Sequence, residues 1–220
     1  MNFFSFFFPQ KIAQINSPTN GRIEVIEQFG EKSIRVQNLE QSGSMVEKIW
    51  EEGLKTLHAT CYMLNAPKIL ILGLGGGSAV KIINKYFPRA KILGIEIDPA
   101  MVKLGREYLN LSKYENLKIK IADVFKWLRA QKLNGSNHFT QYDLILVDLF
   151  LGRKLPEEIE SKEFLSKIKK LLTNEGIVIF NRLRSRDKEV EFQKFLEQLK
   201  KVYHQLKVIK PIANYLVICQ

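Results

Sequence analysis

Cysteine and histidine are scarce in this sequence, and their placement excludes several kinds of chemistry. The two cysteines, Cys61 and Cys219, lie far apart and fit no metal-binding or redox spacing. We therefore expect no metal site, two core cysteines and a reducing cytoplasm as the compartment. The three histidines, His58, His138 and His204, are scattered, so each is expected in the core or at the surface. Of these, His58, near the end of the expected N-terminal helix, is the candidate for lining a substrate pocket.

The sequence also lacks a hydrophobic run long enough to cross a membrane. Its apolar opening, MNFFSFFFP, ends at Pro9, and no Lys or Arg precedes it as a secretory signal would require. This opening is expected to form a strand or an apolar arm that packs on a partner, so a homodimer is compatible with it. The 220 residues are 45% hydrophobic, without internal repeats or low-complexity linkers, which predicts a soluble globular protein with one sizeable core.

Acidic residues are outnumbered, since 23 Asp and Glu stand against 34 Lys and Arg, for a net charge of +11. Such an excess attracts anionic partners, so nucleic acid, an acidic surface and a negatively charged small substrate all stay open. The basic residues are spread along most of the expected helices, which is equally typical of a solvated lysine-rich surface. The densest local group is Arg182, Arg184, Arg186 and Lys188.

From residue 67 onward, apolar segments of strand length alternate with amphipathic segments of helix length. This alternation is typical of a doubly wound α/β fold, in which helices cover both faces of a mostly parallel sheet. Seven strands are expected, at 68–73, 90–98, 117–123, 142–148, 176–182, 205–209 and 215–219. Because the last two are joined by a link too short for a helix, they predict an antiparallel hairpin at the end of the sheet.

The residues before this domain have a different pattern. Segments 21–29 and 32–37 alternate apolar and polar residues around Gly30 and Glu31, which indicates a β-hairpin. A helix is expected to begin at Ser44, with a Ser44–Glu47 capping box, and to run to about residue 58. The predicted regions are an N-terminal β-hairpin region at 1–43, a connecting helix at 44–66 and a Rossmann-like domain at 67–220.

The stretch ILILGLGGGSAV, residues 69–80, predicts a buried strand, a glycine-rich turn and a helix. Gly73, Gly75 and Gly77 leave backbone N–H groups open to a ligand, although Ser78 stands where the dinucleotide motif G-x-G-x-x-G has its last glycine. A glycine-rich turn alone is equally typical of a structural tight turn.

Acidic residues follow the next strands at the same edge of the sheet. Glu96 follows Gly73 by 23 residues, where an acidic side chain accepts hydrogen bonds from ribose hydroxyls. Asp123 ends the third strand and is expected near an adenine amino group, and Asp148 ends the fourth. Three converging carboxylates would repel a pyrophosphate and attract a sulfonium nucleoside with an ammonium tail, which favours S-adenosylmethionine over NAD.

Residues 70–109, followed by IAD at 121–123 and YDLILVD at 142–148, resemble the spermidine-synthase-like branch of the class I methyltransferase superfamily. The resemblance implies a seven-stranded Rossmann-like methyltransferase fold with a small N-terminal β-rich domain, and a donor that is S-adenosylmethionine or its decarboxylated form. The implied site residues are Gly73, Gly75 and Gly77 for the loop, Glu96 for ribose, Asp123 for adenine, Asp148 for catalysis, and Gln41 and Trp50 for the substrate.

Two departures from the family pattern bear on the donor and the acceptor. Aminopropyltransferases have an aspartate in the glycine loop, where this chain has Gly76, and a second acid after the fourth strand, where it has Leu151. The missing loop acid favours ordinary S-adenosylmethionine, whose carboxylate that acid would repel. Arg153 and Lys154 follow, so a polyamine is disfavoured and an anionic or neutral small acceptor is expected.

Three functions remain open from the sequence. The first is a methyltransferase in which Asp148 binds the donor's ammonium or takes a proton from the acceptor. The second is a polyamine aminopropyltransferase, and the third is a non-catalytic relative that binds a nucleoside or nucleic acid. The base-directed methyltransferases are disfavoured, because the segment after the fourth strand has no N/D-P-P-Y/F/W motif and neither cysteine is placed as a nucleophile.

Overall fold

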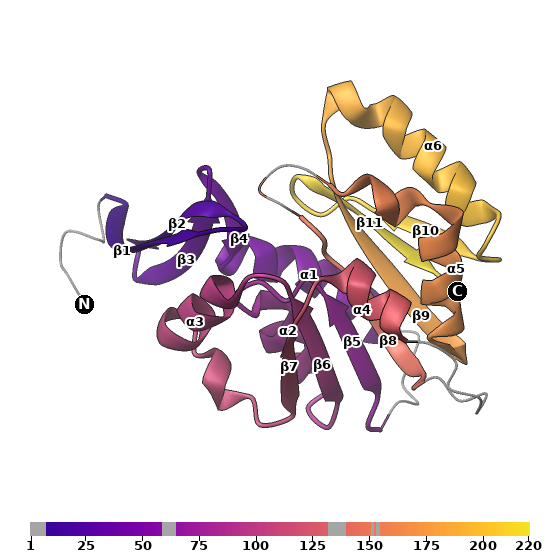
Figure 1. Ribbon diagram of the computed structural model, residues 1–220, viewed down its shortest axis with the longest axis horizontal. Coiled ribbons are helices and arrows are strands. Elements are labelled where there is room, and N and C mark those ends of the chain that lie inside the picture. Colours follow the sequence, from indigo (N-terminus) through magenta and orange to yellow (C-terminus); the bar gives the residue numbers. More distant parts are fainter. Residues whose placement is uncertain (1–7, 59–64, 132–139, 151, 153–154) are drawn as a thin grey trace.

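The computed structural model describes residues 8–58, 65–131, 140–150, 152 and 155–220, which form two β-sheets and the helices around them (Figure 1). Several sequence-based expectations lie outside these residues: those for the apolar opening at 1–7, Cys61, His138, Leu151, Arg153 and Lys154. In the described part of the chain, no helix is long and apolar enough to cross a bilayer.

The larger sheet has seven strands in the order β10-β11-β9-β8-β5-β6-β7. The strands are β5 (Lys68–Leu72), β6 (Lys91–Glu96), β7 (Leu117–Ile121), β8 (Tyr142–Val147), β9 (Leu172–Leu183), β10 (Leu206–Ile209) and β11 (Asn214–Cys219). The first five are parallel to one another, whereas β11 is antiparallel to both β9 and β10, which confirms the predicted terminal hairpin. Because β5 lies between β6 and β8, the strand order reverses at its carboxyl end, where ligands bind in this class of fold.

Helices cover both faces of this sheet. They are α1 (Ser44–His58), α2 (Ser78–Tyr86), α3 (Pro99–Tyr108), α4 (Val124–Ala130), α5 (Lys162–Lys170) and α6 (Glu189–Lys200), with short 3-10 turns η2 (Leu111–Lys113), η3 (Glu157–Glu160) and η4 (Arg186–Lys188). Side chains of α1 and α2 pack on one face, and those of α4, α5 and α6 pack on the other. The fold is therefore the predicted doubly wound α/β arrangement.

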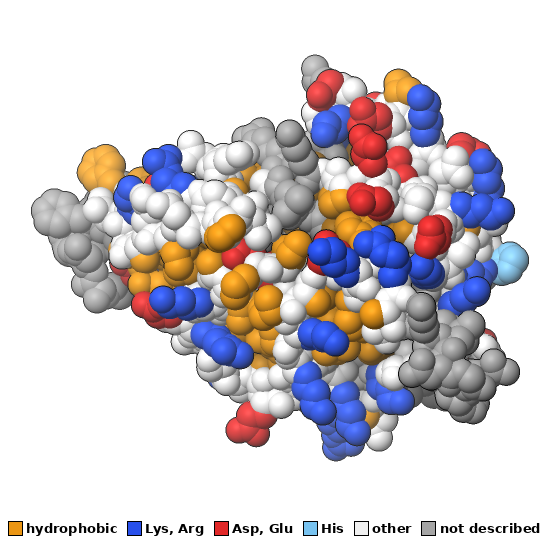
Figure 2. Space-filling model, viewed as in Figure 1, with side chains coloured by type: hydrophobic (Ala, Val, Ile, Leu, Met, Phe, Trp, Pro, Cys, Tyr) orange, Lys and Arg blue, Asp and Glu red, His pale blue; other side chains and the backbone are white. Residues whose placement is uncertain are grey.

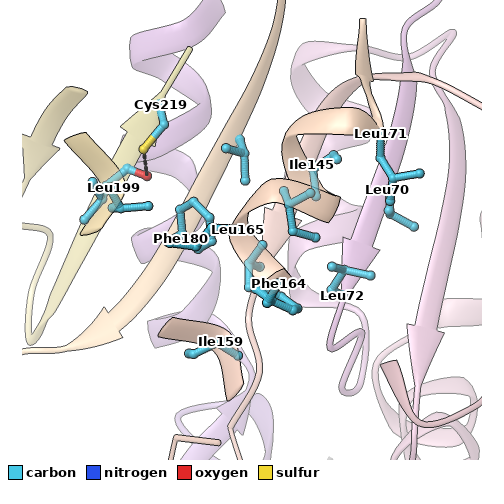
Figure 3. Close-up of a cluster of buried hydrophobic side chains, with 14 of the residues drawn as sticks. Leu70, Leu72, Ile145, Ile159, Phe164, Leu165, Leu171, Phe180, Leu199 and Cys219 are labelled. Atoms are coloured by element: carbon cyan, nitrogen blue, oxygen red, sulfur yellow. Dashed lines mark hydrogen bonds between the residues drawn. The ribbon is translucent and has the colours of Figure 1, made fainter. Parts of the chain in front are cut away.

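The central strand β5 shows why the sequence forms this sheet. Its run KILIL places Leu70 and Leu72 on the face covered by α4, α5 and α6, and Ile69 and Ile71 on the face covered by α1 and α2. A strand buried on both faces needs apolar residues at consecutive positions rather than alternate ones. Figure 3 shows Leu70 and Leu72 in the first of these two cores, together with Cys219, which is fully buried as predicted.

The smaller sheet has four antiparallel strands in the order β1-β2-β3-β4. They are β1 (Gln10–Ser17), β2 (Gly21–Gln28), β3 (Glu31–Val36) and β4 (Leu39–Ser42). The predicted hairpin is β2–β3. Because Gln28 pairs with Glu31, the two turn residues are Phe29 and Gly30, and both have positive φ. The expectation that Gly30 and Glu31 form the turn is therefore wrong by one residue.

Helix α3 packs on both sheets, with Val102 in a core of the larger sheet and other side chains in a separate core with the N-terminal sheet. Ile23 and Val25 of β2 and Ile34 of β3 pack against Met101 and Leu104 of α3. In Figure 1 the N-terminal sheet accordingly lies next to α3, on the side of the molecule away from α6. A polar contact joins the same parts, since Ser17 Oγ and Asn20 Nδ2 donate to Asp98, the residue that caps α3.

Candidate active site

A cavity of about 330 Å³ lies at the carboxyl ends of the parallel strands and is closed on one side by the N-terminal sheet. Six of the predicted site residues line it: Gln41, Gly73, Gly75, Glu96, Asp123 and Asp148. Gly77 and Trp50 are not among the lining residues. In the described part of the chain, no group of three or more His, Cys, Asp or Glu side chains is placed to hold a metal ion.

The glycines of the loop are required by close backbone contacts as well as by their φ angles. A Cβ at Gly73, where φ is +88°, would lie 2.1 Å from the carbonyl oxygen of Asp148. A Cβ at Gly77, where φ is +95°, would lie 2.3 Å from Leu111 Cδ1. Gly77 thus shapes the turn into α2 rather than the wall of the cavity.

The backbone N–H groups of this loop are already used within the protein. They donate in turn to the Ile95 carbonyl (from Gly73 at 3.0 Å and Leu74 at 3.1 Å), Glu96 Oε2 (Gly75, 2.7 Å), Ser42 Oγ (Gly76, 2.8 Å) and the Leu74 carbonyl (Gly77, 3.1 Å). A dinucleotide site needs such N–H groups for its pyrophosphate. The loop is therefore built to approach a ligand closely but not to bind phosphates.

Glu96 ends β6 with its carboxylate held by the backbone. It is 7% exposed, and its two oxygens accept hydrogen bonds from the N–H groups of Gly75 at 2.7 Å and Asp98 at 2.9 Å. Burial raises the pKa of Glu96 above its usual value, although these N–H groups oppose the rise. Each oxygen retains a further lone pair, so the carboxylate can accept hydroxyl hydrogen bonds at the cavity wall.

Asp123 begins α4 as its N-cap residue. Its Oδ1 accepts the N–H of Lys126 at 2.9 Å, which fixes the carboxylate at the cavity wall. The prediction that this residue contacts adenine is compatible with that position, and it stays a prediction.

Asp148 is the centre of a polar network at the base of the cavity. Asn181 Nδ2 donates to its Oδ1 at 2.8 Å, and Trp50 Nε1 donates to its Oδ2 at 3.2 Å. Asn214 Nδ2 in turn donates to Asn181 Oδ1 at 2.6 Å. Burial raises the pKa of Asp148 to about 6; the two hydrogen bonds oppose this rise and the charge of Glu96 adds to it.

Trp50 lies beneath the site rather than at its surface. It is completely buried in the core between the sheet and α1, so its link to the cavity is the hydrogen bond to Asp148. The expectation that Trp50 faces the acceptor is therefore wrong: Trp50 supports Asp148 from below. The indole is large and apolar except at its N–H, so it packs in the core and donates only this hydrogen bond.

Asn181 and Asn214 line the cavity but were not predicted as site residues. The sequence does contain a signal for Asn181. It is a polar residue directly after the apolar run GIVIF, just as Asp148 directly follows LILV. Asn214 has no comparable signal, because it precedes the strand expected at 215–219 and resembles an ordinary turn residue.

The N-terminal sheet supplies the opposite wall. Gln41 of β4 lines the cavity, and its Nε2 lies 3.5 Å from the carbonyl oxygen of Gly152, which follows β8. Asn20, from the turn between β1 and β2, also lines it. The prediction that Gln41 lies on the substrate side is compatible with this position, which is distant in sequence from the glycine loop.

The ionisable residues that line the cavity, among the residues that the structure describes, are all acidic. They are Glu40, Glu96, Asp123, Asp148 and Glu158. The Lys and Arg side chains that the structure describes thus lie elsewhere, and Figure 2 shows such side chains spread over the face drawn there.

Known proteins similar to this chain fall into two enzyme groups. A polyamine aminopropyltransferase of Vibrio vulnificus is 29% identical over 151 residues, which cover 68% of this chain and 49% of that protein. An eEF1A lysine and N-terminal methyltransferase of Homo sapiens is 32% identical over 177 residues, which cover 76% of this chain and 25% of that protein. The chain thus spans half or less of the length of these two relatives.

Solved structures show the same fold. Human methyltransferase-like protein 13 in complex with SAH superposes with a TM-score of 0.66 at 29% identity, covering 80% of this chain and 82% of that chain. A probable spermidine synthase from Corynebacterium glutamicum superposes with a TM-score of 0.77 at 16% identity, covering 97% and 80%. The sequence model of the spermine/spermidine synthase domain matches residues 47–217, most of the chain. The chain therefore belongs to the spermine/spermidine synthase domain family.

Proposed function

We propose that this protein is an S-adenosylmethionine-dependent methyltransferase that acts on an amine. The main support is a cavity at the reversal point of the sheet whose described ionisable residues are acidic and whose glycine loop has no N–H groups left for phosphates. Such a site suits a nucleoside that bears a sulfonium and an ammonium group. Both groups of relatives transfer a group from a donor of this kind.

The parts of the donor match the residues at the carboxyl edge of the sheet. Glu96 would accept the ribose hydroxyls, Asp123 would lie at the adenine, and Gly73 and Gly75 would let the donor approach the main chain. Asp148 lies farther along the cavity, where it would meet either the donor's ammonium group or the acceptor nitrogen.

Methyl transfer is favoured over aminopropyl transfer by the space at Gly76. A Cβ there would lie 2.6 Å from Ile34 Cδ1 and 3.0 Å from Ser42 Cβ, so an aspartate would fit only if the Ile34 side chain and Ser42 moved aside. That aspartate is the family's partner for the decarboxylated donor. The decarboxylated donor therefore lacks its ammonium partner here, and ordinary S-adenosylmethionine is the better candidate.

An amine acceptor agrees better with the cavity than the anionic acceptor expected from Arg153 and Lys154, which lie outside the described residues. Carboxylates attract an ammonium group and repel an anion. The similar proteins are named for a polyamine and for a lysine and N-terminus, which are all amines. We propose this acceptor class for either a small molecule or a protein.

The reaction requires little covalent chemistry from the protein. The sulfonium donor supplies an electrophilic methyl carbon. Asp148, with a pKa raised to about 6, would take the proton from the acceptor ammonium. The freed nitrogen lone pair attacks the methyl carbon in line, the carbon–sulfur bond breaks, and its electron pair returns to sulfur. The cavity walls align the two reactants and exclude water.

Calorimetry with S-adenosylmethionine, decarboxylated S-adenosylmethionine and NAD tests this proposal. We expect ordinary S-adenosylmethionine to bind at least about tenfold more tightly than either alternative. The decarboxylated donor lacks here the acidic loop partner that it has in the family, and the acidic lining repels the phosphates of NAD. Glu96→Gln should weaken its binding, whereas Asp187→Asn, at an exposed carboxylate outside the cavity, should not. Preference for the decarboxylated donor would support the aminopropyltransferase instead.

The third candidate, a nucleic-acid-binding protein without catalysis, has the net charge of +11 in its favour. It predicts binding to RNA that weakens steeply with salt, together with no product from any donor. Both observations in one preparation would replace the enzyme proposal.

A further inference from the structure

We propose that Asn181, held in place by Asn214, is a positioning residue that fixes the Asp148 carboxylate for the transfer reaction. The inference rests on the proposed function, which gives Asp148 its role. Neither asparagine belongs to the sequence motifs of the site.

Hydrogen bonds connect three side chains, each at or near the end of a different strand. Asn214, the first residue of β11, donates through Nδ2 to Asn181 Oδ1 at 2.6 Å. Asn181 of β9 donates through Nδ2 to Asp148 Oδ1 at 2.8 Å, and Asp148 directly follows β8. Since β8, β9 and β11 are adjacent in the sheet, the chain of hydrogen bonds runs across the sheet at the cavity edge.

The Asp148 carboxylate, which only accepts, and Asn214 together fix which way the amide of Asn181 points. An asparagine amide has an accepting oxygen on one side and donating N–H groups on the other. Because Asn214 offers a donor, the oxygen of Asn181 turns toward it, and the N–H groups turn toward Asp148. A reversed amide would place oxygen against the Asp148 carboxylate and nitrogen against nitrogen, which is unfavourable at both ends.

This orientation matters because the surroundings otherwise oppose ionisation of Asp148. The charged groups that line the same cavity in the described chain are Glu40 from β4, Glu96 from β6, Asp123 before α4 and Glu158 from η3, all carboxylates. The groups that favour the ionised form are the N–H donors of Asn181 and Trp50. The N–H of Asn181 stabilises the ionised carboxylate without transferring a proton to it, so Asp148 stays able to act as a base.

A purely structural role would not require this placement. Both asparagines are buried, at 6% and 4% exposure, yet both line the cavity, and their hydrogen bonds end on its central carboxylate. Each Asp148 oxygen receives one protein donor and retains lone pairs for a ligand. The arrangement therefore holds the carboxylate still without saturating it.

The test is a titration of the Asp148 carboxyl by NMR in donor-free protein labelled with carbon-13 aspartate, with the signal assigned from Asp148→Asn. We expect the apparent pKa of Asp148 to rise by about one unit in Asn181→Leu and by a smaller amount in Asn214→Leu, because a charge-assisted hydrogen bond is lost or loosened. Asn214→Thr should restore part of the difference, since its hydroxyl can donate to Asn181.

The matched control is Asn116→Leu. Asn116 is a partly buried asparagine that donates to Asn84 Oδ1 and to the Ala90 carbonyl oxygen, away from the cavity. This variant loses buried amide hydrogen bonds of the same kind and should leave the Asp148 titration unchanged.

The enzymatic readout follows the same order. The acidic limb of the kcat/KM profile should shift to higher pH by the same amount as the titration, with kcat reduced about tenfold or more and donor affinity little changed. Folded Asn181→Leu and Asn214→Leu proteins whose Asp148 titrates as in the parent would overturn the inference. If the Asp148 titration shifted in the variants but the parent protein made no product, the transferase proposal would be rejected. The positioning of the Asp148 carboxylate by Asn181 would still stand.

Discussion

At the scale of single residues, the glycine loop is determined by what surrounds each α-carbon. Gly73 allows β5 and β8 to approach, because the Asp148 carbonyl oxygen occupies the space of its missing side chain. Gly76 makes room for Ile34 and Ser42, which belong to the N-terminal sheet. The glycines of the loop thus make room for different neighbours, and allowing a ligand to approach is one function among several.

Gly73→Ala is expected to unfold the protein or to lower its stability by more than about 3 kcal/mol, since a new methyl group would collide with backbone that cannot move aside. Gly21→Ala is the matched control: Gly21 is also at positive φ, at +67°, but nothing lies within 4 Å of its Cβ position. It should cost only about 1 kcal/mol. Urea unfolding of both variants measures the difference. Equal losses would mean that φ alone explains the glycines.

The sequence predicts which side chains converge where each ends a buried strand, and it does not predict partners that come from elsewhere in the chain. Asp148 and Glu96 follow apolar runs, so their convergence follows from the parallel sheet. Resemblance to the family assigns Trp50 to the substrate, but its burial makes it a support for Asp148. The pair Asn181 and Asn214 depends on the antiparallel register of β9 and β11, which local sequence does not reveal.

The same limit applies to the basic cluster at 182–188. Arg182 is only 8% exposed, pairs with Glu160 at 2.7 Å and lies over the ring of Phe195, 4.5 Å from its centroid. It is therefore an internal residue of the fold and does not belong to a basic surface. Sequence spacing alone does not distinguish these cases, because strand alternation sends neighbouring residues to opposite faces.

At the scale of elements, the junction of β4 and α1 joins the N-terminal sheet to the glycine loop. Ser42 Oγ accepts the N–H of Gly76 at 2.8 Å, and Ser78 Oγ accepts the N–H of Gly43 at 2.9 Å. The first turn of α1 is capped from this junction too: Glu40 Oε1 accepts the N–H of Met45 at 2.8 Å. The cap therefore comes from Glu40 rather than from the predicted Ser44–Glu47 capping box.

Ser42→Ala is expected to cost about 1–3 kcal/mol, because it leaves the buried N–H of Gly76 without its acceptor. Donor affinity should also fall, since the loop loses one of its anchors. The control is Ser161→Ala, which removes the cap of α5 at a residue that does not line the cavity. It should lower stability by about 1 kcal/mol and leave donor binding intact. Thermal melts with and without S-adenosylmethionine separate the two effects.

Element-scale prediction was accurate for the large sheet and incomplete for the small one. All seven strands of the large sheet were predicted. Central strands such as β5 and β8 are buried on both faces and have continuous apolar runs, and the edge strand β7 alternates apolar and polar residues. Strands β1 and β4 were not predicted: β1 is mostly polar and partly exposed, and β4 has four residues. Their pairing partners, rather than their own residues, determine that they are strands.

At the scale of the whole molecule, a positively charged protein encloses an acidic cavity. The net charge of +11 is spread over the surface rather than gathered in one tract, as Figure 2 shows for one face. The local carboxylates dominate within the cavity, because a nearby charge is screened less than a distant one. Net charge is thus a poor guide to the ligand, and the lining residues are the better one.

The two sheets are expected to unfold as one cooperative unit, although the sequence divides them into regions 1–43 and 67–220. The N-terminal sheet buries Ile34 against α3 and close to Gly76 of the glycine loop, so its apolar face is covered by the larger domain. Ile34→Ala should therefore cost about 2–5 kcal/mol. Hydrogen exchange should show amides of β2 and β5 losing protection together.

The control for this prediction is Ile12→Ala, because Ile12 lies on β1 and is 38% exposed, so its loss should change stability by less than about 1 kcal/mol. If Ile34→Ala instead released β2 while β5 kept its protection, the N-terminal sheet would be an independent unit. The wall that Gln41 and Asn20 give the cavity would then open without loss of the donor site. A single shared transition means that the acceptor wall and the donor loop are stabilised together, so a bound donor should protect both sheets.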